Sequence, residues 1–535
     1  MLNLLSAPLP ADNNKTTDLL NSDANLTLLD SVSTIPFTDL ANSSDFYQLL
    51  FAFYTSSFDQ FFVNDLLLTS YSYKPFFPLS VFSGEPFPNS FFPTLFIHNT
   101  STGKLVQTAV LNFNNNPPPN IQNPSAPPYQ ANSLGVLDTA ISPTSTAPYI
   151  AVSAFAPVNG VTLPLPPNLN PPFNYTIYMY SYNTNGTLNY TPVDAVDITS
   201  FNSNIDTNVI TYNSASSFSY DGKYLFVVYT LKSTTSDPSQ RTQVFAGIQV
   251  NSDGTLNRTP AFQYALPNAP AELSPPAGST SLYFVEPDVK SFNPKNSSIY
   301  KLVATFIGFQ AGDETGGNVP GSLLMSFDFN PTVGSISLTG IQNLPGYGNG
   351  IDLHPNNTRV IVGCTGSNPN GLGVAQFPRP PFASDIPESN KNLRLYSYDS
   401  TLSSNALQYI KGHDMGTTEF YNCRWSHSGD FLAISFGTVG AGYASLPVVI
   451  PPSTVTFDPY LAPSSIATLS FNSHRDNFTY ADIQPASATQ ANLAWSSDDS
   501  QLATSGCPAP GIPFSTSSGG FKDLQLYQVV TGDDQ

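Results

Sequence analysis

Seven copies of one short pattern, about seventy residues apart, limit what this chain can fold into. Each copy has an apolar or aromatic residue, a small polar residue, a turn and an apolar run. The clearest are FSYDGKYLFVVYT (218–230), LHPNNTRVIVG (353–363), WSHSGDFLAISFG (425–437) and WSSDDSQLATSG (495–506), and weaker copies begin at 71, 141 and 292. The polar residues are separated by 70, 77, 74, 61, 72 and 70 positions. They are Ser72, Ser142, Ser219, Asn293, His354, Ser426 and Ser496. A regular period of this length is typical of a repeat architecture.

A second pattern follows each copy of the first. It is a short strand, a turn rich in Asn, Asp, Thr and Gly, and another strand, as at 176–188, 243–256 and 393–407. Turns such as NTNG and NSDG are hairpin signals, because these residues tolerate the positive φ that tight turns require. Each unit therefore predicts two hairpins, or four antiparallel strands.

The predicted strands read as continuous apolar runs, such as 224–229 and 360–362, so both faces of each sheet must be covered. Radial stacking of such sheets about one axis covers them. We therefore predict an all-β chain in which residues 65–535 form a seven-bladed β-propeller of four-stranded antiparallel blades. Helical repeats are excluded because the 3.6-residue period is absent.

The last copy of the repeat lacks its fourth strand, since only TGDDQ follows Val530. The segment NLTLLDSV at 25–32 has strand character and precedes the first copy, so we expect it to complete the last blade and close the ring. It belongs to an N-terminal segment, 1–64. Residues 43–62 of that segment suit either a short helix capped by Ser43 or Ser44 or an irregular aromatic plug.

The charge balance excludes one class of partner. Lys and Arg total 18 against 37 Asp and Glu, which gives a net charge of −19, and charged residues make up 10% of the chain. Nucleic-acid binding needs clustered cations, so we do not expect it. We find no export signal and no apolar run long enough to insert into a membrane.

The repeats resemble two propeller families. Gly412-His413 followed by FYNCRWSHSGDFLAIS is similar to a degenerate WD-repeat, although the closing Trp-Asp dipeptide is missing. Hairpins with NSDGTL and STGKL resemble lactonase-type seven-bladed propellers, whose blades repeat D-x-x-T-G-x-L. The likeness covers nearly the whole chain from about residue 65, but these motifs specify turns. The lactonase resemblance implies hydrolysis of sugar lactones by His, Glu and Arg side chains near the central channel.

No catalytic set can be carried over from that family. Most of the histidines are explained by turns, because His354 and His427 lie in or beside turns of the repeat, and His98 and His474 lie in predicted hairpin turns. There is no G-x-S-x-G, H-E-x-x-H or P-loop motif. Of three acidic pairs, Asp498-Asp499 suits a turn and Asp533-Asp534 lies in the tail, so Asp313-Glu314, in a Gly-rich loop, is the better candidate to bind a cation. We predict no catalytic residue, no cofactor and no metal site beyond that candidate pair.

Loop length differs between the two faces of the predicted disc. The second-to-third strand connections are long and rich in proline, for example at 155–174, 366–391 and 438–465, whereas the first-to-second turns are short. Proline lowers the entropy lost when a loop is ordered, and aromatic residues make such loops adhesive. The candidate binding residues in these loops are Phe173, Phe377, Phe382, Phe457 and Tyr460. The alternative is that the loops only roof the channel.

These features favour a non-enzymatic structural or adhesion protein of an extracellular assembly, which we expect to be a virus or phage particle. Its partners are then other proteins of the assembly and a host-surface protein or glycan. A surface of Asn, Ser, Thr and Pro changes little in charge with pH, which suits an exposed particle. The alternatives are a lactonase-like hydrolase of sugar lactones and an intracellular WD-repeat-like adaptor.

Overall fold

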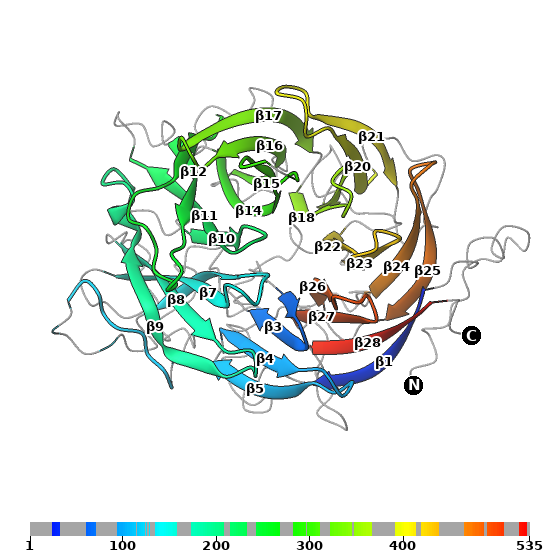
Figure 1. Cartoon of the computed structure of the whole chain (residues 1–535), viewed down its shortest axis with the longest axis horizontal. Helices are drawn as coiled ribbons and strands as arrows, with labels where there is room; N and C mark the ends of the chain where they lie inside the picture. The colour runs from blue at the N-terminus through cyan, green and yellow to red at the C-terminus, as the bar shows by residue number, and fades with distance from the viewer. Residues whose placement is uncertain are drawn as a thin grey trace, which may run out of the picture.

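The computed structural model contains seven four-stranded antiparallel sheets arranged around one axis (Figure 1). The chain is thus a seven-bladed β-propeller, as the repeat predicts. The structure describes residues 24–32, 60–70, 94–113, 115–123, 125, 128, 134–157, 173–207, 214–232, 242–267, 282–295, 297–310, 322–344, 347–365, 391–413, 419–437, 465–485, 489–507 and 524–531. Within these ranges the one helical element is the 3-10 turn η5 (Ile198–Ser200), and no helix is long and apolar enough to cross a membrane.

Each of the first six blades uses four consecutive strands, from the axis outward. Blade one has β2 (Gln60–Val63), β3 (Leu66–Ser70), β4 (Leu95–Asn99) and β5 (Val106–Leu111). Blade two has β6 (Gly135–Ile141), β7 (Tyr149–Pro157), β8 (Phe173–Tyr182) and β9 (Leu188–Asp197). Blade three has β10 (Ser214–Phe218), β11 (Tyr224–Leu231), β12 (Thr242–Gln249) and β13 (Phe262–Ala265).

Blades four to six continue the same order. Blade four has β14 (Leu282–Phe292), β15 (Tyr300–Gln310), β16 (Ser322–Asn330) and β17 (Ser335–Leu344). Blade five has β18 (Tyr347–Leu353), β19 (Arg359–Thr365), β20 (Leu393–Tyr398) and β21 (Leu407–His413). Blade six has β22 (Glu419–Trp425), β23 (Phe431–Gly437), β24 (Ser465–Asn472) and β25 (Asn477–Pro485).

The seventh blade is built from both ends of the chain, which confirms the predicted closure. It has β26 (Thr489–Trp495), β27 (Gln501–Cys507) and β28 (Leu524–Thr531), and β1 (Ala24–Val32) adds as its outermost strand. β1 pairs antiparallel with β28 from Ala24 opposite Thr531 to Val32 opposite Leu524, and the two lie side by side in Figure 1. The outer strand also joins the neighbouring blades: Leu26 N donates to Asp482 of blade six at 2.8 Å, and Leu105 N of blade one donates to Asp30 at 2.9 Å.

Blade one begins earlier than the repeat spacing predicts. Its first-to-second turn is Asn64-Asp65, with Asn64 at φ 55°, and the predicted copy at 71–82 lies outside the described residues. This turn has only two residues, so it does not match the longer turn of the other repeat copies. Gln60–Val63, at the end of the possible helix over 43–62, is instead the innermost strand of the blade. Residues 43–59 are outside the described ranges.

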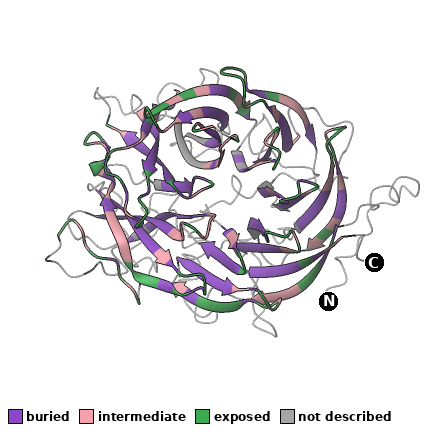
Figure 2. Ribbon diagram, in the orientation of Figure 1, coloured by how far each residue is buried: buried purple, intermediate pink, exposed green. Residues whose placement is uncertain are grey.

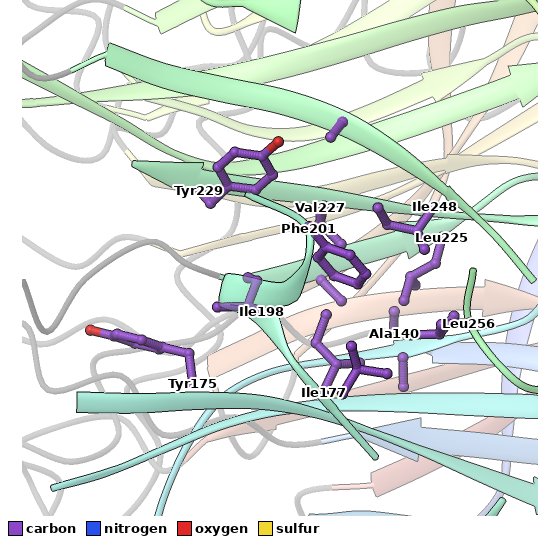
Figure 3. Close-up of a cluster of buried hydrophobic side chains, with 14 of the residues drawn as sticks. Ala140, Tyr175, Ile177, Ile198, Phe201, Leu225, Val227, Tyr229, Ile248 and Leu256 are labelled. Carbon is purple, nitrogen blue, oxygen red and sulfur yellow. The ribbon is translucent and has the colours of Figure 1, made fainter. Parts of the chain in front are cut away.

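The core lies in the seams between blades. Figure 2 shows buried strands through the middle of each sheet, with exposure concentrated on the rim and the turns. Ile177 and Tyr175 of blade two pack with Leu225, Val227 and Tyr229 of blade three in one buried cluster (Figure 3). Apolar residues on both faces of the strands are therefore covered, which is why the runs in the sequence do not alternate.

Candidate functional site at the inner edge of the ring

The inner strands share a local irregularity. In blades two to seven a β-bulge interrupts the pairing of the first strand with the second, for example between Val136 and Asp138 of β6 and between Phe420 and Asn422 of β22. A bulge re-aims the side chain that follows it. In five of these six strands that residue is polar: Asp138, Ser217, Asp288, Asn422 and Asn492. In blade five it is Gly350, where a Cβ would lie 2.9 Å from Asn422 Cα.

Four charged side chains gather on three adjacent inner strands. Asp288 and Lys290 belong to β14, Asp352 to β18 and Arg424 to β22. Lys290 Nζ lies 3.1 Å from Asp288 Oδ1, and Arg424 Nη1 lies 3.5 Å from Asp288 Oδ2. The side chains of Asp288, Lys290 and Arg424 are 25%, 17% and 13% exposed. The group thus links blades four and six while keeping access to solvent.

The backbone of the two neighbouring blades fixes this group. Arg424 Nη1 donates to the carbonyl oxygens of Ile351 (2.9 Å) and Cys423 (3.0 Å). Asp352 accepts from Trp425 N at 2.7 Å and from Leu353 N at 3.0 Å. Both charged groups therefore act as joints between β18 and β22, and their geometry is set by the strands.

The pKa values of the two carboxyl groups are shifted in opposite directions. Burial opposes ionisation of Asp288, but the charges of Lys290 and Arg424 outweigh it, so the pKa of Asp288 lies below its usual value. For Asp352 burial is the larger effect and exceeds the pull of the same two cations, so its pKa lies above the usual value. Opposed pKa shifts of neighbouring carboxyl groups are what general acid and base catalysis requires.

Buried amides join blades six, seven and one beside this group. Asn422 Nδ2 donates to Asn492 Oδ1 at 2.8 Å, and Ser505 Oγ donates to Gln60 Oε1 at 3.0 Å. All four side chains are buried, so these hydrogen bonds replace contacts with water that folding removes. They support the inner edge of the ring rather than presenting a surface.

The candidate loop residues fall in two classes. Phe173 is the first residue of β8 and is 1% exposed, where its ring packs edge-on against Phe155 at 5.6 Å, so it belongs to the core and not to a loop surface. The strand begins at Phe173, earlier than the surrounding prolines indicate. The other candidates lie outside the described residues: Phe377, Phe382, Phe457, Tyr460, Asp313 and Glu314. The described residues contain no group of three His, Cys, Asp or Glu side chains arranged to hold a metal.

The histidines occupy structural positions. His354 Nε2 lies 3.1 Å from Gly429 O of the next blade, and His427 Nδ1 lies 3.0 Å from Asp499 of blade seven. His413 packs edge-on against Phe478 at 5.0 Å, and His474 lies in the β24–β25 turn. His98 is not in the hairpin turn that the sequence predicts but within β4, where burial lowers its pKa to about 4 although Asp30 acts in the opposite direction.

The position of four charged residues within the repeat is the sequence signal for the charged group, and our sequence-based prediction missed it. Asp288, Lys290, Asp352 and Arg424 all lie two to five positions before the polar residue of a repeat copy, on predicted first strands. Aligning the repeat copies on their polar residues would have placed these four side chains at the axis, because the first strand of every blade is innermost.

Comparisons with known proteins give structural neighbours but no family. No family model matches the chain, and no curated protein matches it. Among solved structures, it is similar to a putative 6-phosphogluconolactonase from Bacteroides uniformis, with 11% identity, 77% of this chain and 84% of that chain covered and a TM-score of 0.41. It is also similar to the periplasmic gluconolactonase PpgL from Pseudomonas aeruginosa, with 12% identity, 83% of this chain and 97% of that chain covered and a TM-score of 0.42. A third similar structure is that of the RRP9 WD40 repeats, with 8% identity, 95% of this chain and 98% of that chain covered and a TM-score of 0.40. Lactonase-type and WD40 propellers are thus both among its structural neighbours.

Proposed function

We propose that this chain is a non-enzymatic propeller that serves as a structural or adhesion component of an extracellular assembly, namely a virus or phage particle. It would bind neighbouring proteins of the assembly, and a host-surface protein or glycan, through the face that carries the long connections. The ring supplies a rigid scaffold, and binding residues in many proteins lie on loops that such a scaffold positions.

One observation carries this proposal: charged groups of the described residues serve as joints between blades. Asp194 of blade two binds Arg258 of blade three at 2.8 Å, and Asp499 accepts three hydrogen bonds from the blade-six turn. Tyr300 of blade four donates to Asp221 of blade three at 2.8 Å. Groups used in this way hold the ring together, as a structural role requires.

Topology supports the choice of binding face. Because strands alternate in direction, the end of each second strand and the start of each third strand lie on the same face of the ring. The connections between these ends include 158–172, 366–392 and 438–464, which are long and rich in proline or aromatic residues. The opposite face carries short turns, such as 219–223 and 354–358.

Mass spectrometry of purified particles from the source culture tests this function. The chain should be present at a fixed stoichiometry to the major structural protein and should resist removal by washing. Electron microscopy of the particle should then place the face with the long connections against a neighbour. Particles that lack the chain would exclude the particle role, and a contact through the short-turn face would contradict the choice of face.

A second candidate is a lactonase-like hydrolase, favoured by the charged group at the inner edge. Asp352, with its raised pKa, suits a general acid, and Asp288 stays ionised beside it. Lys290 and Arg424 could stabilise the oxyanion that forms when water attacks a lactone carbonyl. Incubation with sugar lactones, with and without divalent cations, separates the two functions. Turnover that Asp352→Asn abolishes in a folded protein would favour the hydrolase.

A further inference from the structure

A cleft of about 450 Å³ lies on the outer edge of blade two, away from the inner-edge group. One wall is part of the segment that connects β5 to β6, and the other is the outermost strand β9. The lining is dominated by proline and includes one tyrosine: Pro117, Pro119, Pro128, Tyr190, Thr191, Pro192, Val193, Asp194 and Ala195.

The connecting segment is fixed to blade two by two hydrogen bonds. Tyr178 Oη donates to the carbonyl oxygen of Pro119 at 3.1 Å, and Gln122 Nε2 donates to Asp197 Oδ2 at 2.6 Å. The ring of Phe113 packs edge-on against Tyr178 at 6.3 Å. Proline also fixes φ in the connecting segment. The cleft is therefore largely formed before any ligand arrives, which lowers the entropy cost of binding.

The chemistry of the lining indicates an extended, proline-rich ligand. Tyr190 is 42% exposed, and Pro117, Pro119 and Pro128 are exposed on the opposite wall. Proline residues have no backbone N–H, so this wall offers rings and few donors. Segments in the polyproline II conformation dock in grooves of this kind, against aromatic side chains.

Charge at the cleft favours a basic residue in the ligand. Asp194 binds Arg258 at 2.8 Å, whereas Asp197 accepts a hydrogen bond from the neutral amide of Gln122. Two carboxylates and one cation leave the edge of the cleft acidic, on a chain whose net charge is −19. An arginine near the prolines of a ligand would complement it.

The chain itself contains a segment with this chemistry. Residues 377–382 read FPRPPF, with three prolines, one arginine and two aromatic rings. This segment lies outside the described residues, but the strands that flank it, β19 and β20, belong to blade five, whereas the cleft is on blade two across the ring (Figure 1). The segment of a second copy is therefore the better-placed occupant.

We propose that the cleft between Tyr190 and the proline-rich β5–β6 segment binds residues 377–382 of a second copy of the chain. Because the cleft and the segment are different parts of the chain, the contact is head-to-tail and can extend through many copies. The proposal rests on the assembly function above and gives it one site and one partner.

Fluorescence anisotropy with a labelled synthetic peptide of residues 375–384, AQFPRPPFAS, tests the cleft. The folded full-length chain should bind it saturably between ~1 µM and ~1 mM. Tyr190→Ala should weaken binding about tenfold or more, as loss of an aromatic anchor does. Tyr220→Ala is the matched control, because Tyr220 is 44% exposed in a turn of blade three, and it should leave binding unchanged. A peptide with its three prolines replaced by alanine should bind more weakly, and so should one with Arg379→Ala.

Three results would overturn the proposal. The first is that the folded chain does not bind the peptide saturably. The second is that Tyr190→Ala and Tyr220→Ala weaken peptide binding equally. The third is that the peptide with alanine in place of its three prolines binds as tightly as the original peptide. Light scattering tests the occupant: the full chain should self-associate with rising concentration, and Tyr190→Ala should reduce this. Peptide binding without self-association would exclude a second copy as the occupant. If the chain is found in particles but fails these tests, the assembly function stands and only this contact is wrong.

Discussion

Removing Arg424 should destabilise the ring at blades four to six. The guanidinium donates to two main-chain oxygens, of Ile351 and Cys423, and lies 3.5 Å from Asp288, with 13% of the side chain exposed. In the Arg424→Ala variant both carbonyl groups lose this donor, and Asp288 keeps Lys290 as its cation. Hydrogen bonds to charged groups contribute about 1.5–3 kcal/mol each. Water can reach part of the vacated space, so we expect a loss of about 3 kcal/mol, as for breaking a partly buried pair.

The loss should depend on pH in a defined direction. Although burial opposes it, the pKa of Asp288 is lowered by Lys290 and Arg424, so its ionised form stabilises the fold above the unfolded-state pKa. That contribution disappears as the pH falls through the lowered pKa. The difference between wild type and Arg424→Ala should therefore be largest near neutral pH and should shrink in acid.

Urea denaturation at several pH values measures this difference. Arg475→Ala is a suitable control, because Arg475 is an exposed residue of the β24–β25 turn and surface substitutions usually cost less than about 0.5 kcal/mol. An Arg424→Ala loss as small as the control's, or one that stays constant from neutral pH into acid, would refute the assignment of Arg424 as an ionic joint.

Three further perturbations test other parts of the ring. Phe245→Ala should cost about 3–5 kcal/mol in urea denaturation, because its buried ring contacts two rings of its own blade three and two of blade four. The control Val333→Ala, at a site 69% exposed, should cost little. Gly350→Ala should lower the melting temperature, because its Cβ would meet the β22 backbone at 2.9–3.2 Å, and an unchanged melting temperature would contradict this close approach. The protonated His427 ring donates a hydrogen bond to Asp499, which raises the pKa of His427, so this joint weakens as the pH rises through that pKa. Asp499→Asn should lower the midpoint of an NMR titration of His427, and a wild-type midpoint at the ordinary value of ~6.5 would contradict the raised pKa.

The architecture could be predicted because its signals are local. Ser426 and Ser496 are the polar residues of two repeat copies, and each hydroxyl accepts a hydrogen bond from the backbone N–H that opens the next strand, Phe431 N and Gln501 N. The small polar residue is therefore part of the turn itself. The hairpin turns behave likewise: Gly186 and Gly254 adopt φ 83° and 86°, which disfavours other residue types there. Turn residues of this kind recur from blade to blade, so the repeat can be recognised in the sequence.

The prediction was wrong where a local signal was absent or misleading. The Asn64-Asp65 turn of blade one has only two residues and does not match the longer turns of the other blades, so the position of that blade could not be found from the turn pattern. Phe173 follows a run of prolines, but its burial is decided by Phe155 on the neighbouring strand, which is a tertiary contact. Composition and local pattern do not report such contacts.

The inner-edge group shows the same limit for sites. Asp288 and Arg424 are 136 residues apart, and their contact depends on the rotation that places blade six two positions from blade four. The sequence contains the residues and their place in the repeat, but only the closed ring brings them together. Sites built from several blades therefore become visible after the fold is known.

A disulfide cross-link tests the closed ring most directly. Thr27 of β1 and Gln528 of β28 are opposite each other and both exposed, and opposed strand residues have a Cα separation that a disulfide can span. After oxidation of the Thr27→Cys/Gln528→Cys variant, mass spectrometry should find the two peptides linked within one monomeric chain. The Thr27→Cys/Val530→Cys control, two positions out of register, should link poorly. No link in the first variant, or links only between different chains, would contradict a ring closed by its own first strand.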